Sequence, residues 1–372
     1  MNKKQLISMF SEACAINSPS GKEGKMAMWI KKELEFAGWE VWTDNAGKKN
    51  GSDTGNVYSY MEVNPDFETV AFAAHMDTVA KVGDEIKIVF DGRVFKSGGQ
   101  TILGADNKAG LVPLVYFGLN INKSRLKNNI LLFFPTREEE GIMGSKFFSF
   151  KKSKIKYLFN LDGGEGPGPF VYKALGFLNF KIKVKGEAAH AAASYEKGRN
   201  AIVAAADLVK SLPVGKNTKK GTTLNIGIIN GGRATNIVPD IVKIEGELRA
   251  FELLKMEELA TLIKSKCAMV SKKYGVRVKF LEDADGSFSA PHVGSINSRI
   301  CRVARDAAEK VGLTPTFTPA FYTTDANHFS DKGYQTIVVT RGGSNPHTNK
   351  EKVSLSSLIK TYRLIQELAY SS

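Results

Sequence analysis

The sequence predicts an α/β protein in which a mixed, mostly parallel sheet flanked by helices is interrupted by an inserted, ferredoxin-like α+β domain. Short apolar runs, continuous rather than alternating, recur between helical patterns near both ends of the chain, as in strands buried on both faces of a sheet. The middle of the chain instead shows the order β-α-β-β-α-β. A length of 372 residues also exceeds what one ordinary core accommodates.

The larger domain should contain central strands at 70–74, 130–134, 157–160 and 336–340. Helical patterns lie at 107–119, 296–311 and 355–365. Pro113 should kink or shorten the first of these helices. Nearer the amino end, Ser20 and Glu23 have the spacing of a capping box, which predicts a helix through Leu34 that ends at Gly38.

The inserted domain is expected at 176–289, between two parts of the larger domain at 1–175 and 290–372. Its strands should lie at 177–184, 223–229, 241–251 and 276–281, and its helices at 200–212 and 256–274.

The net charge of +14 raises the question of nucleic-acid binding. The lysines are spread along the whole chain, and no helix-turn-helix, zinc-finger or RNP-like motif accompanies them. We therefore interpret the charge as a solvated basic surface and keep nucleic-acid binding as the alternative from another functional class.

The cysteines and the amino-terminal pattern favour a cytoplasmic protein. Cys14, Cys267 and Cys301 are scattered and form no CxxC pair, so neither a disulfide framework nor a cysteine zinc site is expected. Glu12 interrupts the first apolar run, which favours an amphipathic helix over a signal peptide. No stretch is long and apolar enough for a membrane helix.

Histidine and acidic residues follow the four central strands. In chain order they are His75, Asp77, Glu138, Glu139, Asp162 and His347, and Asp106 opens the helix at 107–119. Because ligands of open α/β sheets bind beyond the carboxyl ends of the strands, we expect these side chains at one rim.

So many carboxylates at one rim require cations, and histidine with aspartate and glutamate suits zinc or a related divalent ion such as manganese or cobalt. Two ions held close together need a bridging carboxylate. The residues divide into His75 and Asp162 on one ion, Glu139 and His347 on the other, and Asp106 between them.

Two further residues have expected roles beside the ions. Asp77 lies two residues after His75, so in an extended segment it could accept a hydrogen bond from that ring and fix its tautomer. Glu138 neighbours a ligand and is the candidate general base for a metal-bound water.

Each motif alone has an ordinary structural explanation, such as a glycine-rich turn or a solvated helix start. The combination is what favours a metal site, because the chain has only five histidines and two of them follow central strands beside acidic motifs.

The motifs resemble those of the di-zinc exopeptidase family that contains peptidase T, bacterial glutamate carboxypeptidase and aminoacylase. In the larger domain the matching segments are AAHMDTV (73–79), LGADNKAG (103–110), TREEEGIMGS (136–145), LDGGE (161–165) and PHTNKEKVSL (346–355). In the inserted domain they are GEAAHAA (186–192), GRNAI (198–202) and GGRATNIVPD (231–240). The second segment is most similar to the peptidase T-like members.

The resemblance implies a zinc metallopeptidase that hydrolyses short peptides, with a tripeptide-type aminopeptidase as the favoured activity. It implies a homodimer formed through the inserted domain, which would act as a lid and as a dimerisation surface. Carboxypeptidase, dipeptidase and N-acyl amino acid deacylase activities remain alternatives within the family. It also implies that His190 helps to bind the scissile carbonyl oxygen, often across a dimer interface, and that Asn236 and Arg249 contact substrate.

The chain departs from the family pattern at two places. Residues 322–325 replace the Gly-Gly-Thr-Asp segment that is usual in peptidase T. Arg137 stands where an acidic residue often precedes the glutamate pair, and it could lower the pKa of Glu138 or favour an anionic substrate.

Overall fold

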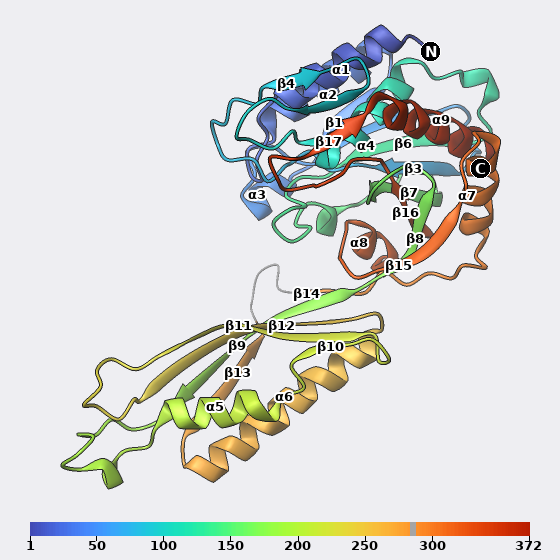
Figure 1. The fold of residues 1–372 in the computed structure, drawn as a ribbon. Coiled ribbons are helices and arrows are strands. Elements are labelled where there is room, and N and C mark those ends of the chain that lie inside the picture. The colour runs from blue at the N-terminus through green and yellow to red at the C-terminus, as the bar shows by residue number, and fades with distance from the viewer. Residues whose placement is uncertain (283–287) are drawn as a thin grey trace. The chain divides into compact units, whose positions relative to one another are not determined.

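The computed structural model describes residues 1–282 and 288–372. The chain divides into two compact units (Figure 1). The first unit comprises Met1–Ala174 and His292–Ser372, and the second comprises Leu175–Pro291. Of the described residues, none forms a helix that is long and apolar enough to cross a membrane.

The first unit is built on a mixed eight-stranded sheet in the order β1-β2-β6-β3-β7-β16-β8-β15. The strands are β1 (Glu40–Thr43), β2 (Val57–Met61), β6 (Asn129–Phe134), β3 (Thr69–Ala73), β7 (Ile155–Gly163), β16 (Thr336–Thr340), β8 (Pro169–Ala174) and β15 (Thr316–Ala320). The neighbours β6, β3, β7 and β16 run parallel to one another, whereas β1, β2 and β6 pair antiparallel. The parallel centre therefore directs four strand ends to one rim.

Both faces of this sheet are covered, which explains the continuous apolar runs. Val70, Phe72 and Phe159 pack in one core with the longer helices, whereas Ala71 and Phe133 pack in a second core with the aromatic residues of β2. The helices are α1 (Lys3–Ala15), α2 (Gly24–Phe36), α3 (Ala46–Asn50), α4 (Ala105–Leu119), α7 (Arg299–Lys310), α8 (Ala326–Asp331) and α9 (Leu355–Ser371), with 3-10 turns η1 (Lys123–Arg125) and η2 (Ser145–Phe147). A small sheet joins β4 (Ile88–Phe90), β5 (Val94–Ser97) and β17 (Lys352–Ser354).

The expectation about Pro113 is wrong. Helix α4 continues through the proline to Leu119, and its non-helical backbone angles occur at Asp106 and Asn107 instead. The residues around Pro113 are buried between the sheet and the neighbouring helices α1 and α9, so tertiary packing outweighs the local cost of the proline.

The second unit has a ferredoxin-like core. Its sheet has the order β10-β11-β12-β9-β13, with β14 also paired to β9, and all of these pairs are antiparallel. The elements are β9 (Gly176–Lys185), α5 (Ala201–Ser211), β10 (Gly215–Asn217), β11 (Thr222–Gly231), β12 (Ile241–Ala250), α6 (Leu253–Tyr274), β13 (Arg277–Glu282) and β14 (Phe288–Ser289), with a 3-10 turn η3 (Tyr195–Lys197). The predicted β-α-β-β-α-β order is present, and β10 and β14 are additions to it. Helices α5 and α6 cover one face of the sheet (Figure 1).

The capping box predicted at Ser20 and Glu23 does not form. Helix α2 begins at Gly24, and the side chain of its N-cap residue, Glu23, makes no capping hydrogen bond. The N–H of Gly24 instead donates to Oδ1 of Asp53, at 2.9 Å. Ser20 instead donates a hydrogen bond to Asp77, at 2.6 Å, and Glu23 accepts hydrogen bonds from the backbone N–H groups of Gly21 and Arg137. These side chains therefore brace the rim of the sheet rather than the helix.

Candidate metal centre

The rim at the carboxyl ends of β3, β6, β7 and β16 brings the five proposed ligands together. His75, Glu139 and His347 lie in the segments that follow β3, β6 and β16, respectively, and Asp162 is the penultimate residue of β7. Asp106 reaches the same place from the first residues of α4. The separation along the sequence is large, so only the parallel centre of the sheet makes them neighbours.

Asp106 stands between two pairs of potential ligands. Its Oδ1 lies 3.3 Å from Nε2 of His75, which is itself 3.6 Å from Oδ1 of Asp162. Its Oδ2 lies 3.4 Å from Nε2 of His347, which is 3.1 Å from Oε2 of Glu139. The two oxygens of one carboxylate thus face two different histidine and carboxylate pairs, the arrangement that a bridging ligand requires.

The donor set fits a divalent cation. Nε2 of His75 is buried and has no hydrogen-bond partner among residues 1–282 and 288–372, although carboxylate oxygens surround it. Ligand atoms of His75, Glu138 and Asp162 lie within 4.8 Å of one another, and so do those of His75, Asp106 and Glu139. Imidazole nitrogen with carboxylate oxygen suits zinc and neighbouring first-row metals.

Asp77 is buried and contacts several residues of the candidate metal centre. Its Oδ1 lies 3.3 Å from Nδ1 of His75, and the same ring nitrogen lies 3.1 Å from the carbonyl oxygen of Asp77. The carboxylate also accepts hydrogen bonds from the backbone N–H groups of Glu138, at 3.0 Å, and Glu139, at 3.1 Å. One side chain therefore orients a histidine and the chain segment that carries two glutamates.

The charges at the rim shift the pKa values of its members. Burial alone would raise the pKa of Asp106, but the charge of Arg341 and hydrogen bonds with His347 and His75 hold it well below its ordinary value. Hydrogen bonds with Asp106 and Glu139 raise the pKa of His347 to about 10. Without divalent ions, the carboxylates at this rim thus favour positively charged neighbours.

Glu138 differs from the other carboxylates. Burial, followed by the nearby charge of Asp162, raises its pKa well above the ordinary value. Its Oε2 lies 4.0 Å from Nε2 of His75, so it is close to the proposed ligands without occupying the bridging position of Asp106. A buried carboxyl group with a raised pKa beside a reaction site is suited to proton transfer.

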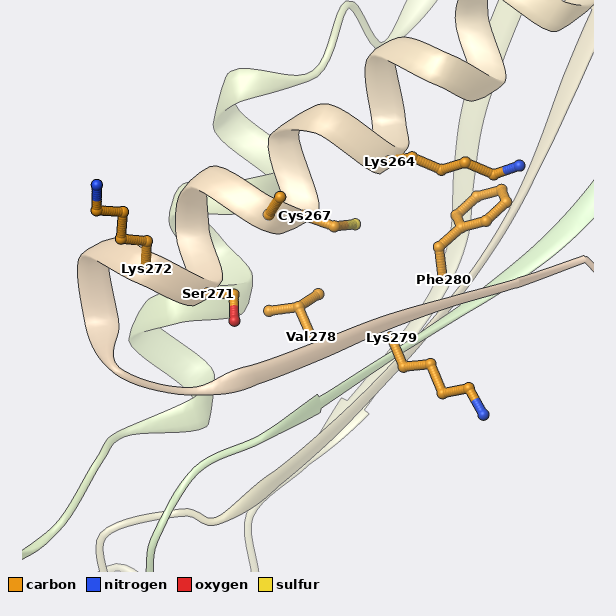
Figure 2. Close-up of a pocket in the computed structure, with 8 residues that line it drawn as sticks. Lys264, Cys267, Ser271, Lys272, Val278, Lys279 and Phe280 are labelled. Atoms are coloured by element: carbon orange, nitrogen blue, oxygen red, sulfur yellow. The ribbon is translucent and has the colours of Figure 1, made fainter.

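A cavity of about 250 Å³ opens onto these groups. Its lining includes Asp106, Glu138, Glu139, Asp162, Gly163, Gly164, Tyr322, Thr323, Thr324, Arg341, Pro346 and His347. A second concavity, of about 560 Å³, lies on the second unit between α6 and β13 and is lined by Lys264, Cys267, Ala268, Ser271, Lys272, Val278, Lys279 and Phe280 (Figure 2). Among the described residues it is lined by neither histidine nor carboxylate, unlike the cavity at the candidate metal centre.

Arg341 is a site residue that the sequence analysis missed. It is 6 % exposed, and its Nη2 contacts Oδ1 of Asp106 and lies 3.6 Å from Oδ1 of Asp162. The available signal was its position directly after the last central strand, where the other site residues also occur.

The side chain of Arg137 pairs with groups outside the cavity. Its Nη1 donates to the carbonyl oxygen of Asn50, and its Nη2 pairs with Glu140 at 2.5 Å, so the side chain does not line the cavity. The pKa of Glu138 is raised rather than lowered, because burial and the charge of Asp162 dominate.

His190, Asn236 and Arg249 belong to the second unit. His190 is exposed, and its Nδ1 accepts hydrogen bonds from the backbone N–H groups of Ala192 and Ala193, at 3.2 and 3.1 Å. Asn236 lies on the adjoining segment, where its carbonyl oxygen accepts from Ala191 N–H at 3.0 Å.

Arg249 is half-buried on β12. Its guanidinium pairs with both carboxylate oxygens of Glu247, at 2.6 and 2.8 Å. It also lies over the ring of Phe177, 5.7 Å from the centroid. Arg249 therefore already has a carboxylate partner, and a substrate carboxylate would have to share its guanidinium with Glu247.

Comparisons with known proteins agree with this geometry. Residues 172–275 match the model of the peptidase dimerisation domain, and residues 56–210 match the model of peptidase family M28. The chain is 28% identical to the uncharacterized protein YqjE of Bacillus subtilis (strain 168), covering 98% of this chain and 97% of that protein. It is 23% identical to peptidase T of Clostridium botulinum (strain Loch Maree / Type A3), with 98% of each covered.

Solved structures of similar fold include the aminopeptidase PepT from Bacillus cereus ATCC 10987, with a TM-score of 0.92 and 29% identity over 100% of this chain and 99% of that one. A tripeptidase from Staphylococcus aureus has a TM-score of 0.91 and 24% identity, covering 100% of this chain and 98% of that one. These matches confirm the predicted α/β fold with its inserted domain and the predicted resemblance. The chain is therefore similar along its length to peptidase T and its relatives.

Proposed function

We propose that this chain is a metal-dependent aminopeptidase that removes the first residue of short peptides, tripeptides in particular. The observation that carries the proposal is Asp106, whose two oxygens face two histidine and carboxylate pairs beside the buried Glu138. The similarity to peptidase T, the aminopeptidase PepT and a tripeptidase supports the substrate class.

Two divalent ions, zinc or alternatively manganese or cobalt, would be held at this rim. His75 and Asp162 would bind one ion, His347 and Glu139 the other, and Asp106 would bridge them. When bound, such ions supply a Lewis acid that polarises a carbonyl group and lowers the pKa of water. A solved structure of similar fold, the Bacillus subtilis YXEP protein, is described as a dinuclear metal-binding peptidase.

Glu138 would act as the general base and then as the general acid. Its carboxylate would accept the proton of the attacking water and return it to the leaving amine. Asp77 would hold the His75 ring and the Glu138–Glu139 backbone in position through the contacts described above.

On the second unit, His190 would donate a hydrogen bond to the scissile carbonyl oxygen. Its Nδ1 accepts backbone N–H groups, so a neutral ring carries its proton on Nε2, where it can be donated. Asn236 and Arg249 would contact the substrate, and Arg249 is chemically suited to a peptide carboxylate. The match to a dimerisation domain supports a homodimer formed through this unit.

The three free, buried cysteines are consistent with a reducing cytoplasm as the site of action.

The test is hydrolysis by the metal-loaded protein of free tripeptides, dipeptides, amino-blocked peptides and N-acyl amino acids. Release of the amino-terminal residue from free tripeptides supports the proposal. Cleavage of only N-acylated or amino-blocked substrates would transfer the assignment to a deacylase or carboxypeptidase.

A variant tests the proposed general base, and a binding assay tests the nucleic-acid alternative. Glu138→Gln should retain metal and lose at least about 100-fold in kcat, the usual contribution of a general base; unchanged turnover would exclude the proposed base. Salt-sensitive binding of DNA or RNA by metal-free protein, without peptide hydrolysis, would favour the nucleic-acid alternative.

A further inference from the structure

Arg341 places a permanent positive charge among the carboxylates of the candidate metal centre. It follows β16 directly and is almost completely buried. Its Nη2 contacts the oxygen of Asp106 that faces His75, and its Nη1 donates to the carbonyl oxygen of Gly163 at 2.9 Å. The guanidinium is therefore fixed both by the backbone after Asp162 and by the proposed bridging residue.

Other groups fix the acidic side of this contact. Glu351 accepts hydrogen bonds from the backbone N–H groups of Gly104, at 2.7 Å, and Asp106, at 2.8 Å, so the segment that carries Asp106 is held from behind. The carbonyl oxygen of Arg341 accepts from Oγ1 of Thr361 at 2.9 Å. The charged groups that face Arg341 are thus Asp106, Asp162 and Glu351.

This placement has opposite consequences in the presence and absence of divalent ions. Without them, buried carboxylates repel one another, and a guanidinium in contact with two of them offsets that repulsion. With them, the ions neutralise the same carboxylates, and the guanidinium becomes a neighbour of like charge. Its contribution to stability should therefore be largest in the metal-free protein.

We propose that Arg341 is a positioning residue with two effects. In the metal-free protein its charge balances the carboxylates of the candidate metal centre, and in the metal-loaded protein it lowers the affinity of that centre for divalent ions. The proposal rests on the proposed function, because it requires that this rim binds divalent ions. Its mechanism is purely electrostatic: the guanidinium holds Asp106 and Asp162 in place, and competes with the ions for their charge.

The two effects are linked thermodynamically. If loss of Arg341 destabilises the metal-free protein more than the metal-loaded protein, the variant must bind metal more tightly by the same free energy. We expect Arg341→Met to lower the Tm by several degrees more in chelator than in excess zinc. We expect its zinc affinity to rise by about tenfold, since one unit charge beside a divalent ion is removed.

The experiment combines thermal unfolding, in chelator and in zinc, with zinc titration against a competing chelator. Arg341→Lys retains the charge and should stay closer to the unsubstituted protein in both measurements. Arg137→Met is the matched control, because this arginine also lies at the rim but pairs with Glu140 and with the carbonyl oxygen of Asn50. Its Tm should fall equally with and without zinc.

Equal Tm losses for Arg341→Met in chelator and in zinc would overturn the proposal, since they would indicate an ordinary structural role. Weaker zinc binding by this variant would overturn it as well. If Arg341→Met folds only in zinc, the proposal is supported; if it folds in neither condition, the same comparison on Arg341→Lys decides. Failure of the unsubstituted protein to bind zinc, manganese or cobalt would instead sink the proposed function.

Discussion

Asp77→Asn should separate the positioning of the metal centre from the ligands themselves. In the structure this carboxylate accepts hydrogen bonds from Ser20 and from the backbone N–H groups of Glu138 and Glu139, and it pairs with the His75 ring. Burial would raise the pKa of Asp77, but the hydrogen bond and charge of His75 outweigh it and lower the pKa. The folded protein therefore favours the charged carboxylate.

The size of the effect follows from these contacts. An asparagine has the same shape and keeps one acceptor oxygen. Its NH2 group replaces the other oxygen and cannot accept the hydrogen bonds that this oxygen receives. Hydrogen bonds to a charged group contribute about 1.5–3 kcal/mol each, so loss of one or two should lower the unfolding free energy by about 2–4 kcal/mol. Loss of a partner that orients a metal-binding histidine typically costs about 10–100-fold in affinity.

The assays are denaturant unfolding of the metal-free protein and zinc titration against a competing chelator. Ser20→Ala is the matched control, because it removes a single contact to the same carboxylate, at 2.6 Å, and should cost about 1 kcal/mol with little change in affinity. Zinc affinity in Asp77→Asn equal to that of the unsubstituted protein would refute the idea that Asp77 orients the centre.

Three further predictions concern ligation, pH and packing. Asp106→Ala should reduce the bound metal measured by elemental analysis, because both ions lose a ligand, and full occupancy would exclude the bridge. Burial lowers the pKa of His292 from 6.5 to about 4. Between these pH values the folded state therefore binds fewer protons than the unfolded state. This contribution to the free energy of unfolding, up to about 3 kcal/mol, is fully present above pH 6.5 and is lost as the pH falls toward 4. His292→Gln should reduce the pH dependence of the unfolding free energy, measured with urea, between pH 4 and 6.5. Above pH 7 the curves of the variant and the unsubstituted protein should run parallel. Phe133→Ala should cost about 3–5 kcal/mol, because its ring packs 4.7 Å from those of Tyr58 and Phe148. Phe36→Ala, at a ring that is 93% exposed, should change stability by less than about 0.5 kcal/mol.

The sequence by itself determined the central strands and the residues that meet at their ends. Continuous apolar runs such as 130–134 form strands because only a sheet covered on both faces buries every side chain. Parallel strands then direct His75 and Asp162 to one rim, whatever the details of packing. Both inferences depend on patterns that are local or that topology alone fixes.

Only the tertiary structure decided where individual polar side chains point. Ser20 and Glu23 have the spacing of a helix cap, yet they bind Asp77 and the backbone of Arg137, which are distant in sequence. Arg137 turns toward Glu140, whereas Arg341 turns into the carboxylates. The physical reason is that a charged side chain goes to the partners that compensate its desolvation, and the fold, not the neighbouring residues, sets which partners are within reach.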